Sequence, residues 1–159
     1  MPNETRDAQD VEILAALQED GRISNASLAA RVGMSEAACW RRVKRLEDDG
    51  VIVGYQAILD RRKLGLGVVA FVLVRLANHR GEEPSAFEDA LRDVPEVLAC
   101  HNITGHADYL LHVVARDLDA YGELVHGRLR QLPGVASLTS SLMLRRVKYA
   151  RRLPLELVG

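Results

Sequence analysis

Four cations stand within five positions of one another, at Arg41, Arg42, Lys44 and Arg45. Arginine forks pair with guanine edges or with phosphates, and a short side chain such as Ala37 lets a helix backbone approach the bases of the major groove. The pattern is typical of a DNA-recognition helix. The alternative is a solvated basic face on an ordinary surface helix.

The residues around these cations predict a single helix, with Ser35 as its N-cap and Gly50 as its left-handed end. Cys39, Val43 and Leu46 fall at i, i+4 and i+7 and form the predicted buried stripe. The opposite face and its shoulders are predicted to contact DNA, through Ser35, Glu36, Ala37, Trp40, Arg41, Arg42, Lys44 and Arg45.

Two further helices are predicted upstream, one starting at Asp7 or Asp10 and ending at Gly21, the other starting at a Ser24 or Asn25 cap and ending at Gly33. Only residues 33–34, with glycine at the bend, separate the second helix from the third. So tight a connection indicates a helix-turn-helix. In the first helix, Val11, Leu14 and Leu17 are predicted to form one apolar stripe with Ile13 beside it. The second helix is predicted to bury Leu28, Ala29 and Val32.

The β-branched run over residues 51–55 predicts a strand, so that a wing follows the third helix. Together these elements predict a winged helix-turn-helix domain over residues 1–58. Residues 59–67 carry three cations and two glycines and predict a linker. Its cations either touch DNA phosphates or are simply solvated.

The remaining residues, 68–159, predict a second domain. Strand and helix patterns alternate as strand, helix, strand, strand, helix, strand, over residues 68–76, 85–94, 97–104, 108–115, 117–132 and 135–149. This order predicts a ferredoxin-like βαββαβ domain and an α+β chain overall. Such a domain leaves one sheet face uncovered, which favours dimerisation and hence the twofold symmetry that paired DNA half-sites need.

Composition excludes several classes of protein. The formal charge of −1 argues against a general nucleic-acid coat, although the four clustered cations suit specific docking. Two cysteines are too few for a disulfide framework or a cysteine zinc site. The longest apolar run, residues 66–74, is too short to cross a bilayer, and no signal peptide precedes Asp7. We therefore expect a cytoplasmic protein.

At this level the chain resembles the Lrp/AsnC (leucine-responsive and asparagine regulator, or feast/famine) family of transcription factors over nearly its whole length. The motifs that carry the resemblance are residues 10–17, 20–24, 28–29, 32–35, Cys39 with 42–47, 50–52, 105–111 and 132–135. Their order and spacing make the match specific. Trp40 and residues 46–50, 95–98, 139–141 and 147–149 look most like the branch that answers to L-cysteine.

The resemblance implies a transcriptional regulator without a cofactor that dimerises through its ferredoxin-like domains, often assembling further into tetramers or octamers. It also implies that an amino acid binds between dimers, near a Gly-x-x-Asp-Tyr turn. Carried over to this chain, the effector site is Gly105, Asp108 and Tyr109, with Asn102 and Ser140 as neighbours. Cysteine, another amino acid and no effector all remain open.

The residues of this turn suit the role. Gly105 lets backbone N–H groups approach a carboxylate, while Asp108 either receives an ammonium group or only caps the turn. Tyr109 is either a ligand contact or part of the core. No metal site is predicted, because Cys100 and His101 would point to opposite faces of a strand.

Two other functions compete with an effector-controlled regulator. Tetrapyrrole decarboxylases resemble this family, but the intact basic helix and the lack of a paired acid/base constellation argue against an enzyme. An architectural DNA-binding protein without an effector would show weak sequence preference and a steep salt dependence.

Overall fold

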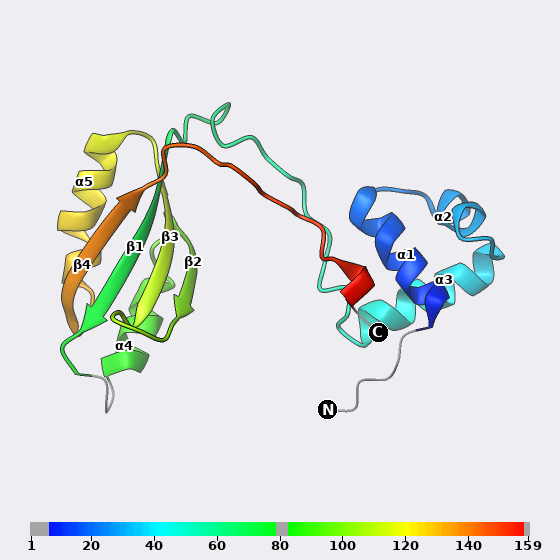
Figure 1. Ribbon diagram of the computed structural model, residues 1–159, viewed down its shortest axis with the longest axis horizontal. Coiled ribbons are helices and arrows are strands. Elements are labelled where there is room, and N and C mark those ends of the chain that lie inside the picture. The colour runs from blue at the N-terminus through cyan, green and yellow to red at the C-terminus, as the bar shows by residue number, and fades with distance from the viewer. Residues whose placement is uncertain (1–6, 79–82, 158–159) are drawn as a thin grey trace. The chain divides into compact units, whose positions relative to one another are not determined.

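The computed structural model describes residues 7–78 and 83–157, in two compact units. The helical unit consists of the residues up to Ile58 together with those from Lys148 onward, and the sheet unit runs from Leu59 to Val147. The chain therefore passes from one unit to the other twice (Figure 1). Each unit has its own apolar core.

Three helices build the helical unit, as predicted: α1 (Ala8–Glu19), α2 (Asn25–Arg31) and α3 (Glu36–Asp48). Each begins at a side-chain N-cap, namely Asp7, Ser24 and Ser35, whose oxygen accepts a backbone N–H three residues later. The structure thus decides the open alternatives for the first two starts in favour of Asp7 and Ser24. Gly50 ends α3 at φ 69°, the left-handed conformation expected there.

The predicted apolar stripe of α1 needs a correction. Val11, Leu14 and Leu17 are only half-buried, whereas Ile13 and Ala16 are fully buried. The reason is that α1 turns Ile13 and Ala16 toward the core shared with α2 and α3. Leu14 and Leu17 pack against the edge of this core and, with Val11, line an open hollow together with residues 51–58, Arg151, Leu153 and Leu155.

The predicted wing strand is wrong: residues 51–58 are described but contain no strand. Val51 and Ile52 instead donate their backbone N–H groups to the Leu46 carbonyl and pack against the helical core. Val53, by contrast, is almost fully exposed. A strand requires a second segment to pair with, and nothing in the described part of the chain pairs with this one.

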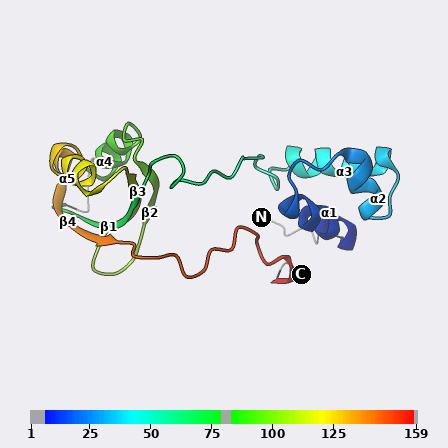
Figure 2. The same cartoon turned by 90° about the horizontal axis from the view of Figure 1, so that it is seen from above.

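The sheet unit has the predicted βαββαβ order. Its elements are β1 (Val68–Leu76), α4 (Glu83–Leu91), β2 (Val97–Asn102), β3 (Tyr109–Ala115), α5 (Leu118–Gly127), the 3-10 turn η1 (Leu129–Gln131) and β4 (Val135–Leu142). The strands form one antiparallel sheet in the order β2-β3-β1-β4. Figure 2 shows α4 and α5 on the same side of this sheet.

Several element boundaries differ from prediction. The helix predicted over residues 117–132 is α5 followed by η1, and β2 ends at Asn102 instead of residue 104. Helix α4 begins at Glu83, before the predicted start at Ser85, and so includes Pro84. Proline is tolerated there because first-turn N–H groups lack a helical partner. Strand β4 ends at Leu142 instead of continuing to residue 149. Its partner strand β1 begins at Val68, and the Met143 N–H donates to the Val69 carbonyl. Beyond Met143, β1 therefore has no further residue with which β4 could pair.

The two sheet faces differ as expected for this fold. The face toward α4 and α5 holds a core in which Val72, Val74, Phe87, Leu111 and Leu129 are completely buried. The other face exposes Phe71, which stacks on His112 at 5.2 Å between ring centroids, and leaves the cross-strand pair Leu73 and Leu110 half-buried. The predicted open face therefore carries apolar side chains.

The tail corrects the predicted extent of the second domain, because residues from 148 onward belong to the helical unit. Leu153 is bound at both backbone groups by one side chain: its N–H donates to Oε1 of Gln18 (2.6 Å), and its carbonyl accepts from Nε2 of Gln18 (3.2 Å). Arg152 pairs with Glu19 at 3.1 Å. The C-terminal segment is thus tied to α1.

Candidate DNA-binding surface and effector turn

The connection between α2 and α3 is held by backbone bonds and one side chain. Gly33 turns the chain at φ 67°, after which the Met34 N–H donates to the Ala29 carbonyl at 2.9 Å. The Asn25 side-chain amide donates to the Glu36 carbonyl at 3.1 Å. The start of α3 is therefore fixed against α2, as a recognition helix must be.

Helix α3 exposes nearly all of its predicted DNA-binding face. Cys39 and Leu46 are buried beneath it, as the spacing predicted. The exposed members of the set are Ser35, Glu36, Ala37, Trp40, Arg41, Lys44 and Arg45. Arg42 is the exception, with a side chain only 25% exposed. Of the predicted cations, Arg42 therefore lies farthest from solvent.

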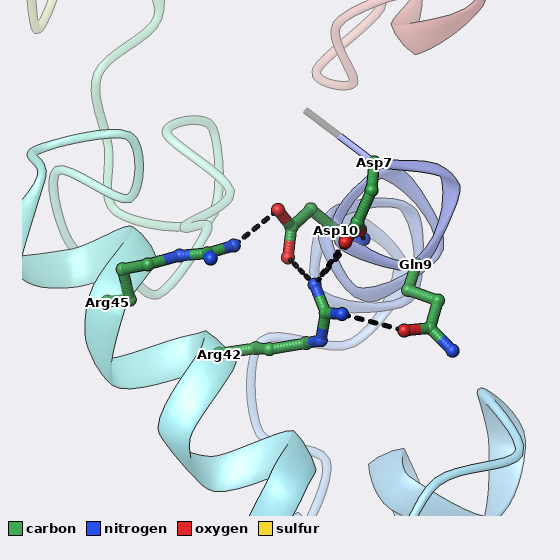
Figure 3. Close-up of polar contacts among 5 residues, drawn as sticks. All are labelled: Asp7, Gln9, Asp10, Arg42 and Arg45. Carbon is green, nitrogen blue, oxygen red and sulfur yellow. Dashed lines mark hydrogen bonds and ion pairs between the residues drawn. The ribbon is translucent and has the colours of Figure 1, made fainter. Parts of the chain in front are cut away.

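Arg42 and Arg45 reach from α3 to the beginning of α1 (Figure 3). Nη1 of Arg42 bonds Asp7 (2.7 Å) and Asp10 (2.9 Å), and Nη2 bonds Oε1 of Gln9 (2.8 Å). Nη2 of Arg45 bonds the other carboxylate oxygen of Asp10. We call these five residues the charge cluster.

Asp7 and Arg42 favour each other's charged forms within the charge cluster. The pKa of the Asp7 carboxyl lies below its usual value, because the Asp10 N–H and the Arg42 guanidinium both donate to it. The pKa of Arg42 is raised by its hydrogen bonds to Asp7 and Asp10. The cluster therefore neutralises much of the positive charge that the sequence assigns to α3.

The other two cations of α3 differ in their availability. Lys44 pairs with Asp48 at 2.8 Å, but both side chains are more than half exposed, so water and salt screen this pair. Within residues 7–78 and 83–157, Arg41 has no hydrogen bond or ion pair. With Arg42, Arg45, Gln9, Met34, Ser35 and Ala38 it lines an open hollow of about 480 Å³. Arg41 is thus free to bind an anion.

Four of the five predicted effector residues lie together where β2 passes into β3. Gly105 has φ 118°, which a side chain would strain. The Asp108 carboxylate accepts the Leu76 N–H at 2.8 Å, and its carbonyl accepts from the Asn102 side chain at 3.0 Å. Asp108 therefore does fasten the turn to β1, one of the two roles considered for it.

Tyr109, the fourth of these residues, points into the sheet unit. It is 4% exposed, its ring lies 4.8 Å from that of Phe87, and its hydroxyl donates to Oε1 of Glu88 at 2.8 Å. Burial, with the Glu88 hydrogen bond, raises the pKa of Tyr109 to about 12. Asn102 and Tyr109 line a cavity of about 450 Å³ together with Glu88, Leu91, Arg92, Val97, Leu98, Ala99 and Cys100.

Ser140 does not join this group. It lies on β4, whereas Asn102 lies on β2, and these are the two outer strands of the sheet. Three strand spacings separate them, about 14 Å. The Ser140 hydroxyl accepts a hydrogen bond from the Tyr121 hydroxyl at 2.6 Å, so within its own chain it anchors α5 to β4.

Sequence reasoning missed Asp10 and Glu88. Asp10 stands three residues before the buried Ile13, so a charge on the inward side of an amphipathic helix was a usable signal. Glu88 follows the buried Phe87 on α4 and carries no comparable signal.

No group of three or more His, Cys, Asp or Glu side chains that could hold a metal ion occurs within the described residues. Nor does any helix among them have the length and apolar character needed to span a membrane.

Cys100 is expected to react slowly with alkylating agents. Desolvation of its thiol, with a smaller contribution from the Glu88 carboxylate, raises the pKa to about 11, so little thiolate exists at pH 8. Iodoacetamide should label it on the order of a hundredfold more slowly than an ordinary cysteine thiol. Mass spectrometry separates it from the buried Cys39. Equal rates for Cys100 in native and denatured protein would contradict this expectation.

A helix-turn-helix with an exposed basic third helix, joined to a βαββαβ sheet unit, defines a DNA-binding transcriptional regulator. Residues 6–53 match a winged helix-turn-helix DNA-binding model, and residues 69–153 match the Lrp/AsnC ligand binding domain. The chain belongs to the Lrp/AsnC family. It is a transcriptional regulator and not an enzyme, which sets the tetrapyrrole decarboxylase alternative aside.

Individual relatives agree. The DNA-binding transcriptional activator DecR of Escherichia coli strain K12 is 39% identical over 150 residues, which cover 94% of this chain and 99% of that protein. The leucine-responsive regulatory protein of the same strain is 37% identical over 155 residues, 98% and 94% of the two chains. A crystal structure of a Neisseria meningitidis transcriptional regulator in complex with L-methionine has a TM-score of 0.92 at 37% identity, covering 98% of this chain and 100% of that one.

Proposed function

We propose that this regulator reads its operator with the exposed face of α3 and that a free amino acid, bound beside the turn at residues 105–109, changes its DNA affinity or assembly. The observation that best supports the effector site is the composition of its cavity. Glu88 and Arg92 place a carboxylate and a guanidinium in one cavity, next to Asn102 and Tyr109. These charges are complementary to the ammonium and carboxylate groups of an amino acid.

The regulator is proposed to act as a dimer or a higher even-numbered assembly. The open face of the sheet supports this, because Phe71 is exposed there and Leu73 and Leu110 are only half-buried. A twofold dimer would present two α3 helices to the half-sites of an operator. The effector can shift the operator-bound population only as far as its affinities for the two states differ.

L-cysteine is the first effector to test, followed by L-methionine and the other amino acids. The measurement is thermal unfolding of the full chain with each amino acid in turn, since a ligand bound only by the native protein stabilises it by mass action. One selective shift would identify the effector. If no amino acid shifts the transition, the protein acts without an amino-acid effector.

Asp108→Asn is expected to abolish the effector response and leave both fold and DNA binding intact. The amide retains an oxygen that can accept the Leu76 N–H, while the negative charge offered to the ammonium group is lost. Asp108→Ala, in contrast, should also destabilise the fold by about 1–3 kcal/mol, because it strips a buried N–H of its acceptor.

Glu88→Gln provides the comparison, since it removes the carboxylate that lines the cavity itself. The readout for all three variants is operator affinity with and without the effector. If Asp108→Asn and Glu88→Gln both respond as the unaltered protein does, the effector binds elsewhere.

A further inference from the structure

Asp10 is the one charged or polar residue that is buried within the described chain, at 3% exposure. Both of its carboxylate oxygens are used, and by different arginines of α3: Oδ1 accepts from Arg42 and Oδ2 from Arg45. Asp7, the second acid of the charge cluster, is 52% exposed at its side chain and bonds only Arg42 of the two arginines. A buried carboxylate on α1 thus holds two cations of the DNA-reading helix.

The two arginines are held in different ways. Both terminal nitrogens of Arg42 donate hydrogen bonds, to Asp7, Asp10 and Gln9, and its side chain is three-quarters buried. Few of its donors remain for a phosphate or a base. Arg42 therefore braces α3 against α1 instead of facing DNA.

Arg45 is held at one edge only. Nη2 bonds Asp10, while the side chain is 53% exposed and its other nitrogens have no partner in the described chain. An arginine fixed at one nitrogen presents the rest of its fork in a single direction. It then loses less rotamer entropy when it binds DNA than a mobile side chain would.

We propose that Asp10 is a positioning residue for operator recognition: it orients Arg45 toward DNA and keeps Arg42 away from it. A carboxylate beside the basic face lowers attraction for phosphates in general, because it cancels positive charge. In exchange it fixes the geometry on which base reading depends. Asp10 accordingly raises the ratio of operator affinity to affinity for unrelated DNA.

Asp10→Asn tests this directly in the full-length protein. Removing the charge should strengthen binding to unrelated duplex DNA and steepen the slope of log affinity against log salt concentration by about one phosphate contact. Operator affinity should not rise by the same factor as affinity for unrelated DNA, because Arg45 is no longer held by the Asp10 carboxylate. We expect the ratio of operator to unrelated-DNA affinity to fall about tenfold.

Asp7→Asn is the matched control, as it removes the same charge from the same cluster. Asparagine still caps a helix, and the Asp10–Arg45 contact remains. Affinity for the operator and for unrelated DNA should therefore rise together and leave their ratio unchanged. The same change of ratio in Asp7→Asn and Asp10→Asn would mean that Asp10 contributes only charge, and would overturn the proposal.

Arg45→Lys keeps the proposal testable if Asp10→Asn unfolds, which thermal unfolding would reveal. Lysine retains the charge but has no fork, so it cannot bond Asp10 through one nitrogen and present others to DNA. The affinity ratio should fall with the salt dependence unchanged. An unaltered ratio in this variant would also overturn the proposal.

Discussion

Arg41→Ala is expected to weaken operator binding by about 1–3 kcal/mol, roughly 5- to 150-fold, without affecting the fold. Arg41 lies on the face of α3 opposite the buried Cys39 and Leu46, and it has no partner in the part of the chain that the structure describes. Its loss therefore costs the folded state no contact. Fluorescence anisotropy on an operator duplex measures the affinity, and thermal unfolding checks the fold.

Two further variants separate the origins of this effect. Arg130→Ala removes the same charge from an exposed position of the sheet unit and should leave operator affinity unchanged. Arg41→Lys keeps the charge without the fork, so it should restore binding if Arg41 contacts a phosphate and fail to restore it if Arg41 reads a base. Equal losses for Arg41→Ala and Arg130→Ala would contradict a specific contact.

Phe87→Ala is expected to destabilise the sheet unit by about 3–5 kcal/mol. Phe87 is completely buried between α4 and the sheet, and its ring packs on that of Tyr109. The cavity left behind would also loosen the Tyr109 hydroxyl that bonds Glu88. The core of the helical unit shares no residue with this one, so its own packing should persist.

Calorimetry combined with fluorescence can follow the two units separately. Trp40 is the single tryptophan and lies on α3, so its emission reports on the helical unit. In Phe87→Ala the midpoint temperature of the calorimetric unfolding transition should fall. The midpoint followed by tryptophan fluorescence should fall less. Leu28→Ala, in the helical core, should show the opposite pattern. If Phe87→Ala lowers the free energy of unfolding of the sheet unit by less than about 1 kcal/mol, the expected destabilisation is contradicted.

The parts of the fold that the sequence predicted correctly are those set by local signals. The caps Ser24 and Ser35 and the glycine bend at Gly33 lie within a few residues of the helices that they delimit. The predicted wing failed for the opposite reason. The β propensity of residues 51–55 says nothing about a partner strand, and pairing is a property of two distant segments.

The same distinction applies to the candidate sites. Helical spacing alone placed Arg41 on the exposed face of α3. The partners of Arg42 lie 32 to 35 residues earlier in the chain, so no local pattern could show that this arginine faces α1. Ser140 was selected by resemblance, and its distance from Asn102 depends on the strand order, which only the folded sheet reveals.

Because the tail belongs to the helical unit, two separate stretches of the gene encode that unit. A coding fragment that stops at codon 58 specifies all three helices but lacks Leu153, which Gln18 binds at both backbone groups. It also leaves the apolar face of Val11 and Leu14 without the tail residues beside it. A single recombination event in the linker therefore cannot transfer this DNA reader whole; two crossovers are required. Exchanging the sheet unit while keeping the DNA reader intact likewise needs one crossover in the linker and another before codon 148.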